Sequence, residues 1–249
     1  MLYYETLGKG DPVLLIHGYL ENLKMWKDIA VELAKEHLVI MCDNPGHGSS
    51  SNYGEVHSME FMAQKINEVL EHLNVHRVPV VGHSMGGYIT LAFVELFPEK
   101  VSSFLLLNSS TLSDTEEKKE LRKRAGEVAQ KNIETLIKMS IPLLFAENAS
   151  DLKSEKEFAR EMMRETSIAG ILAALKGMSR RPERTHLLND FDSKIGILLG
   201  KADRTVDPQA FKKSIPKREN ISVLELDCGH MSFLEKPDET IDFVKKIID

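Results

Sequence analysis

The chain has 249 residues, of which 42% are hydrophobic and 28% are charged, an ordinary composition for a globular protein. These proportions exclude a disordered, a collagen-like and a low-complexity chain, and a chain of this length can bury a large core without disulfide or metal support. The net charge of −6 argues against a dedicated nucleic-acid binder, which needs a basic face, so we expect no nucleic-acid partner.

The sequence gives no indication of a membrane span, a signal peptide or a disulfide framework. No stretch of 18 apolar residues occurs, and Met1 to Glu5 have neither the basic start nor the apolar run of a signal peptide. We therefore expect no membrane partner and a cytoplasmic location. Two cysteines, Cys42 and Cys228, are too few for a disulfide framework and have no partner at metal-ligand spacing. Both are expected to be buried thiols in a reducing compartment.

Short apolar runs alternate along the chain with amphipathic segments of helix length. The runs predict strands at residues 13–16, 38–42, 78–81, 104–107, 195–199 and 223–226. Helices are predicted at 25–35, after the N-cap Ser58, at 84–97 before Pro98, and from Pro237 onward. Because nearly continuous apolar strands alternate with helices, the pattern predicts an α/β fold with a mostly parallel, doubly wound sheet covered on both faces. The residues that follow each strand should then meet at one binding edge.

The alternation stops between Leu112 and His186, where no strong strand run occurs. Charged residues crowd its first part, which is typical of a solvated helix face, and apolar residues at helical spacing follow. We interpret residues 112–186 as a helical cap inserted into an α/β core that consists of residues 1–111 and 187–249.

The run 78–81 leads into Gly82-His83-Ser84-Met85-Gly86, a Gly-x-Ser-x-Gly pattern between a predicted strand and a predicted helix. This pattern is typical of a nucleophile elbow, in which a serine stands on a sharp, strained turn. Side chains two residues before and after the serine would collide with the neighbouring helix and strand, which explains Gly82 and Gly86. The following helix directs its N-terminus at the place where negative charge develops. Ser84 is therefore the candidate nucleophile.

A serine nucleophile needs a base, and the base needs an acid that orients it. The last predicted strand leads into His230, and the strand before it leads into Asp203, so both residues belong to loops at the same sheet edge. Asp207 is a rival acid, but it precedes Pro208 and is better explained as a helix cap. Asp114, after another predicted strand, is a weaker rival.

Backbone N–H groups are the expected donors to an oxyanion. The turn after residues 13–16 would expose the N–H of Tyr19, and Met85 N–H directly follows the nucleophile. Two histidines near Ser84, His17 and His83, are expected to brace this loop through hydrogen bonds. No carboxylate or thiolate lies at ligand spacing with them, so we expect no metal. Candidate pocket residues are His17, Trp26, Met139 and Met162.

With these motifs, nearly the whole chain resembles the α/β-hydrolase fold superfamily. The resemblance rests on five motifs in the order of that family: His17-Gly18, Asp43 to Ser49, Gly82 to Gly87, Gly200 to Asp203, and Gly229 to Met231. It implies Ser84 as nucleophile, Asp203 as acid and His230 as base, in the chain order of the family. It also implies that residues 112–186 are the variable cap that shapes the substrate pocket. The chain begins near the second or third strand of the family, so we expect an edge strand to be absent.

These features together predict a cofactor-independent serine hydrolase that cleaves small carboxylic esters through an acyl-enzyme. Serine at position 84 argues against the dehalogenase and epoxide-hydrolase branches, which would require a carboxylate there. One alternative is a carbon–carbon bond hydrolase or a pyruvate-eliminating lyase of the same fold. A second alternative is a ligand receptor that retains the triad. An anionic substrate would need cationic side chains, and the cap candidates are Arg122, Arg124, Arg180, Arg181 and Arg184. The oligomeric state does not follow from the sequence.

Overall fold

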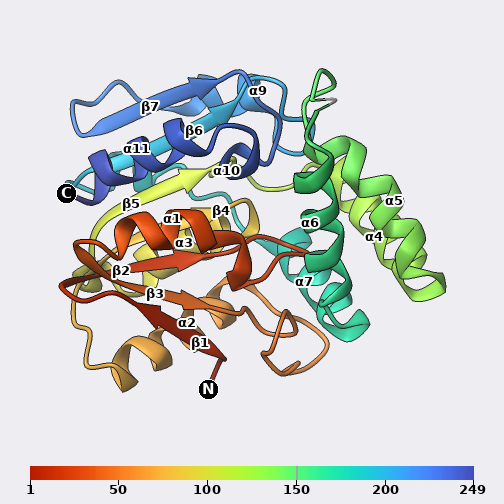
Figure 1. Cartoon of the computed structure of the whole chain (residues 1–249), viewed down its shortest axis with the longest axis horizontal. Helices are drawn as coiled ribbons and strands as arrows, with labels where there is room; N and C mark the ends of the chain where they lie inside the picture. The colour runs from red at the N-terminus through yellow and green to blue at the C-terminus, as the bar shows by residue number, and fades with distance from the viewer. Residues whose placement is uncertain (150) are drawn as a thin grey trace.

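The computed structural model describes residues 1–149 and 151–249, and within them it places a seven-stranded sheet flanked by helices (Figure 1). The strand order is β1-β3-β2-β4-β5-β6-β7. Neighbouring strands are parallel except β1 and β3, which are antiparallel. This confirms the predicted mostly parallel α/β sheet. The strands are β1 (Tyr4–Leu7), β2 (Asp11–Ile16), β3 (His37–Cys42), β4 (Val78–His83), β5 (Val101–Leu107), β6 (Ile195–Gly200) and β7 (Ile221–Leu226).

Strand β1 is absent from the sequence-based prediction. It lies at the edge of the sheet, where Tyr4 pairs with Cys42 and Leu7 with Val39. Its side chains are mostly exposed, so it lacks the continuous apolar run that marks the central strands. The four buried residues that end β2, Val13 to Ile16, show the opposite pattern.

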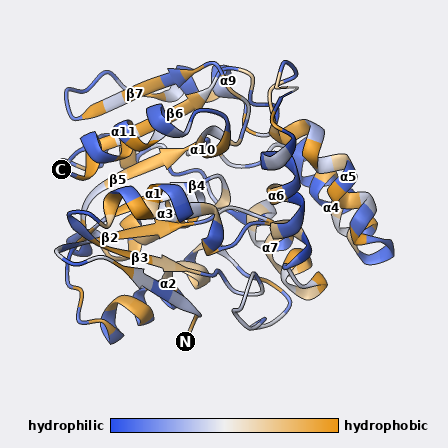
Figure 2. Ribbon diagram, viewed as in Figure 1, coloured by the Kyte–Doolittle hydropathy of each residue, from blue (hydrophilic) through white to orange (hydrophobic). Residues whose placement is uncertain are grey.

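Helices cover both faces of the sheet, as doubly wound folds require. Helices α1 (Lys27–Leu33) and α11 (Pro237–Ile248) pack together on one face, and α2 (Met59–His72) and α3 (Met85–Leu96) on the other (Figure 1). Figure 2 shows that the apolar residues concentrate in the strands between these layers. Shorter helices complete the core: α8 (Leu187–Asp190), α9 (Pro208–Ser214) and α10 (Ser232–Glu235), with 3₁₀ turns at Leu23–Trp26 and Pro98–Lys100.

Two predicted helix caps are confirmed in the core. The Ser58 side chain accepts a hydrogen bond from Phe61 N–H at 3.1 Å at the start of α2. The Asp207 carboxylate accepts one from Gln209 N–H at 2.9 Å and so begins α9. Asp207 therefore has the structural role that the sequence indicates.

In the described residues, four helices lie between β5 and α8: α4 (Glu116–Lys131), α5 (Ile133–Leu144), α6 (Lys153–Arg164) and α7 (Ile168–Arg180). They stack beyond the carboxyl ends of the strands (Figure 1). Backbone hydrogen bonds tie α7 to the core: His57 N–H donates to Ala173 O at 3.0 Å, and Ser167 N–H to Gly46 O at 3.3 Å. All four helices fall within the predicted cap, 112–186, whose boundaries stay a prediction.

Two smaller expectations can be compared with the structure. Cys42 and Cys228 are free thiols and both are buried, as predicted. None of the helices within the described residues is long and apolar enough to cross a membrane.

Candidate active site

Ser84 lies in the sharp turn between β4 and α3, at the carboxyl edge of the sheet. Its φ of 52° and ψ of −116° form a strained conformation that residues other than glycine rarely adopt. A Cβ on Gly82 would collide with the carbonyl of Gly86, and a Cβ on Gly86 with the carbonyl of Ile16. The steric reason given for the two glycines is therefore confirmed.

His230 and Asp203 reach Ser84 from neighbouring loops. His230 lies between β7 and α10, and Asp203 follows β6. The Ser84 Oγ and His230 Nε2 atoms are 2.8 Å apart, and His230 Nδ1 is 2.7 Å from Asp203 Oδ2. The side chains of His230 and Asp203 are almost fully buried. The structure thus brings three residues that are far apart in the sequence into one hydrogen-bonded line.

The Asp203 carboxylate is surrounded by donors. Burial opposes its ionisation, but the charge and hydrogen bond of His230 hold the pKa of Asp203 below its usual range. The backbone N–H groups of Thr205 and Val206 contribute to this shift by donating to Oδ1 at 2.7 and 2.9 Å. An ionised Asp203 accepts a hydrogen bond from the Nδ1–H of His230. The proton of the neutral ring is then on Nδ1, so Nε2 is free to accept the Ser84 proton.

Asn108, directly after β5, contacts both loops and was missed by sequence reasoning. Its Nδ2 donates to Gly229 O at 3.0 Å and to Asp203 Oδ2 at 3.3 Å. Its φ of 45° lies in the left-handed region, which asparagine tolerates better than most residues. The available signal was its position: a polar residue immediately after an apolar strand run in a parallel sheet.

Two backbone N–H groups lie beside the nucleophile. Met85 is the first residue of α3, so its N–H has no acceptor within the helix. A Cβ on Gly18 would lie 3.1 Å from the Cβ of Ser84, which places the backbone before Tyr19 next to the nucleophile. Tyr19 N–H makes no backbone hydrogen bond within residues 1–149 and 151–249. The role of Tyr19 and Met85 as oxyanion donors stays a prediction.

Glu21 is the second residue near the site that was missed. It is only 4% exposed, and its Oε2 accepts hydrogen bonds from Gly18 N–H at 2.5 Å and from His83 Nδ1 at 3.0 Å. The opposite ring nitrogen of His83 donates to the backbone carbonyl of His230 at 2.9 Å. His83 thus reaches the oxyanion loop through Glu21. A lone glutamate in a loop gives no sequence signal for this role.

His17 braces the same loop and is fully buried. Its Nε2 accepts a hydrogen bond from Asn44 N–H at 2.8 Å, and its Nδ1 donates to Gly18 O at 2.8 Å. Burial lowers the pKa of His17, which keeps the ring neutral. These bonds occupy both ring nitrogens. In the part of the chain that the structure describes, no group of three or more histidine, cysteine or acidic side chains is arranged to hold a metal ion.

The remaining candidate pocket residues lie in three different environments. Trp26 is buried in the core, with its ring centroid 6.5 Å from that of Phe233. Met162 is buried on α6. Met139 is 58% exposed on α5, so the structure does not bring it to the site. The sequence alone does not show which face of this helix is exposed, so it does not distinguish a surface position from a buried one.

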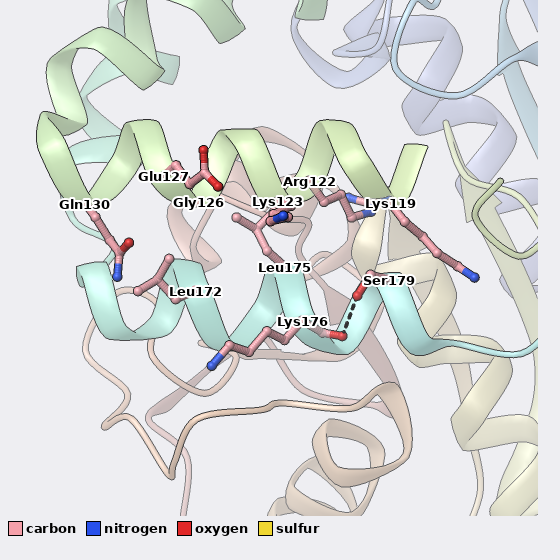
Figure 3. A pocket seen from close by; sticks show the side chains of 10 residues that line it. All are labelled: Lys119, Arg122, Lys123, Gly126, Glu127, Gln130, Leu172, Leu175, Lys176 and Ser179. Carbon is pink, nitrogen blue, oxygen red and sulfur yellow. Dashed lines mark hydrogen bonds between the residues drawn. The ribbon is translucent and has the colours of Figure 1, made fainter. Parts of the chain in front are cut away.

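The cap has a groove of about 280 Å³ between α4 and α7 (Figure 3). Leu172 and Leu175 contribute apolar surface to it, and Lys119, Lys123 and Lys176 contribute positive charge. No member of the Ser84, Asp203 and His230 line is among its lining residues. The groove is therefore a separate feature of the cap.

A hydroxyl, an imidazole and a carboxylate in this line, on a strand-to-helix turn, are the arrangement that serine hydrolases use for acyl transfer. A family model described as alpha/beta hydrolase fold matches residues 11–237. The chain belongs to this family.

Solved structures of esterases are similar to the chain. A malate-bound thermophilic esterase from Thermogutta terrifontis is 30% identical, with a TM-score of 0.91 over 98% of this chain and 92% of that one. A structure from a study of carboxylesterases of Nitrososphaera gargenis is 27% identical, with a TM-score of 0.83 over 98% and 92%.

A curated relative adds a similarity at lower coverage. The dihydrolipoyllysine-residue acetyltransferase component of the acetoin cleaving system of Pseudomonas putida is 27% identical over 244 residues, which are 95% of this chain and 63% of that protein. The chain spans less than two thirds of the length of the curated relatives it matches.

Proposed function

We propose that the protein hydrolyses small carboxylic esters through an acyl-enzyme on Ser84. The observation that carries this proposal is the pair of short hydrogen bonds, 2.8 Å from Ser84 to His230 and 2.7 Å from His230 to Asp203. Both fall within the range needed for proton transfer between a nucleophile, a base and its orienting acid. The two esterase structures at 27% and 30% identity support the ester as substrate.

In the acylation step, His230 Nε2 takes the proton of Ser84 Oγ as the oxygen attacks the acyl carbon. The resulting imidazolium is stabilised by Asp203, whose low pKa keeps it ionised. The N–H groups of Tyr19 and Met85 donate to the oxyanion, each worth about 3 kcal/mol in the transition state. His230 then gives the proton to the leaving alcohol, and the ester bond breaks.

In the deacylation step, the same groups act on water. His230 Nε2 removes a proton from a water molecule that attacks the acyl-enzyme carbonyl, and the proton passes to Ser84 Oγ as the acyl bond breaks. The carboxylic acid leaves and the free serine returns. No cofactor enters either step, and the small-molecule ester is the one partner that the proposal requires.

The cap arginines give no support to the alternative of an anionic substrate for carbon–carbon cleavage. Arg122 and Arg181 both bind the buried carboxylate of Asp114, at 3.1 and 2.8 Å for the Oδ1 atom. Arg184 binds Glu95 at 3.0 Å. The remaining two, Arg124 and Arg180, are exposed. Each of these three guanidinium groups is thus paired with a carboxylate of the protein itself, with Arg122 and Arg181 sharing that of Asp114.

Hydrolysis of p-nitrophenyl esters with graded acyl length tests the proposal. We expect turnover that depends on acyl length, and a fall in kcat on the order of 10⁶-fold in Ser84→Ala. Ser154→Ala, an exposed serine on α6, is the matched control and should retain full activity. Turnover that persists in Ser84→Ala would refute Ser84 as nucleophile. A folded wild-type protein that binds ligands but does not turn over any ester would favour the receptor alternative.

A further inference from the structure

A second pair of histidine and carboxylate lies behind the first. Glu21 and His83 are buried at 3.0 Å from each other, and their side chains are 5% and 0% exposed. The rings of His83 and His230 are adjacent, with centroids 5.0 Å apart. The proposed mechanism gives this pair no proton to move, yet burying two charges is unfavourable unless they are paired and hydrogen-bonded.

The hydrogen bonds favour an ionised pair. Both ring nitrogens of His83 point at acceptors, Nδ1 at the Glu21 carboxylate and Nε2 at the carbonyl oxygen of His230. With Glu21 as a carboxylate, both ring nitrogens face acceptors and both carry protons, so His83 is an imidazolium. Burial opposes this charge, but Glu21 raises the pKa of His83, and His83 in turn lowers the pKa of Glu21 against the effect of burial. The other charges that act on the pair come from His17, His230 and Asp203.

Each end of the pair holds a different part of the reaction centre. Glu21 Oε2 accepts the N–H of Gly18 at 2.5 Å, one residue before the candidate oxyanion donor Tyr19. His83 Nε2 holds the backbone of the base, His230, at 2.9 Å. His83 itself is covalently attached to Ser84. The pair therefore links the nucleophile, the base and the oxyanion loop through two charged side chains that do not touch the reacting atoms.

We propose that Glu21 and His83 are positioning residues that fix the oxyanion loop and the His230 loop relative to Ser84, an inference that rests on the proposed ester hydrolysis. Because the two charges cancel, the His83 imidazolium does not oppose the positive charge that His230 acquires during acylation. When the Glu21 charge is removed, His83 either loses a proton or keeps an uncompensated positive charge beside His230. Either change displaces one of the two loops or disfavours the transition state.

The kinetic test uses the isosteric variants Glu21→Gln and His83→Asn with p-nitrophenyl acetate. We expect kcat to fall by about 10- to 100-fold in each while KM changes little, because the loops act on the transition state more than on substrate binding. The double variant should lose little more than the worse single variant, since both remove the same link. The matched control is Glu32→Gln, because Glu32 lies on α1 and its carboxylate pairs with Lys35. A folded Glu21→Gln enzyme with wild-type kcat, or losses that simply multiply in the double variant, would overturn the proposal.

A test that needs no turnover is the ¹⁵N NMR spectrum of the His83 ring in the wild-type protein. We expect both ring nitrogens to be protonated at pH 7, and the signature of a neutral ring to appear in Glu21→Gln. A neutral His83 in the wild-type protein overturns the proposal even if no variant can be purified. If the imidazolium is present but no ester is turned over, the pair is upheld and the proposed ester hydrolysis is the part that fails.

Discussion

Asn108 provides a quantitative test of how the acid and the base are held. Replacing Asn108 with glycine keeps the left-handed backbone and removes the bonds to Gly229 O at 3.0 Å and Asp203 Oδ2 at 3.3 Å. A neutral buried bond contributes about 1 kcal/mol and a bond to a carboxylate about 1.5 kcal/mol or more, so we expect Asn108→Gly to lose about 2–3 kcal/mol of unfolding free energy. Asn108→Ala should lose about 1 kcal/mol more, because alanine resists a φ of 45°.

The same two variants are expected to lower kcat/KM about 10-fold or more, since the loop that carries His230 loses an anchor. Urea unfolding and p-nitrophenyl ester kinetics measure the two effects separately. Asn74 is the matched control, because it has a φ of 55° but is exposed in the turn that precedes β4, whereas Ser84 follows that strand. Asn74→Ala should cost about 1 kcal/mol and leave kcat/KM unchanged. Wild-type stability and activity in Asn108→Gly would refute the assigned role.

Two further predictions concern pH and the cap. Burial lowers the pKa of His47 to about 3. Below pH 6.5 the unfolded chain therefore binds a proton that the folded chain does not bind, and the free energy of unfolding decreases as the pH is lowered. Between pH 7 and pH 5 the wild type should therefore lose about 2 kcal/mol more than His47→Gln in urea unfolding; equal losses would contradict a buried neutral ring. In the cap, a Cβ on Gly170 would collide with the carbonyl of Gly46, so Gly170→Ala should lose about 1–3 kcal/mol and change the acyl-length preference. Gly126→Ala in α4 meets only the flexible ends of two leucine side chains and should be neutral or stabilising, and similar losses in both variants would show that the collision is not the cause.

The central strands and the hydrogen-bonded line of Ser84, His230 and Asp203 were predictable from sequence because their patterns are local. Buried parallel strands are continuous apolar runs, and each candidate catalytic residue lies in the turn or loop that follows a strand. The two glycines around Ser84 add a steric signature that the structure explains contact by contact. In a parallel sheet Ser84, Asp203 and His230 then lie at the same edge, and this can be predicted without knowing how the side chains pack.

The features that were missed depend on contacts between distant segments. Strand β1 pairs at the edge through its backbone, and its side chains are too exposed to form an apolar run. Glu21 lies 62 residues from its partner His83, and the sequence does not show that it is buried. Met139 falls on a helix whose inner face is decided by packing against the other cap helices, so its exposure could not be predicted from its chemistry.

The His230 loop also contacts the predicted cap through its backbone. The backbone N–H groups of His230 and Met231 both donate to Leu144 O, at the end of α5, at 2.8 and 3.2 Å. The Glu235 carboxylate also connects the His230 loop to the predicted cap. It accepts one hydrogen bond from Gly229 N–H at 2.9 Å and another from Ala146 N–H at 3.0 Å. The loop that carries the base is therefore attached to the cap as well as to the core. We therefore expect a displacement of the end of α5 to move His230 relative to Ser84, and so to change the distance over which the proposed proton transfer takes place.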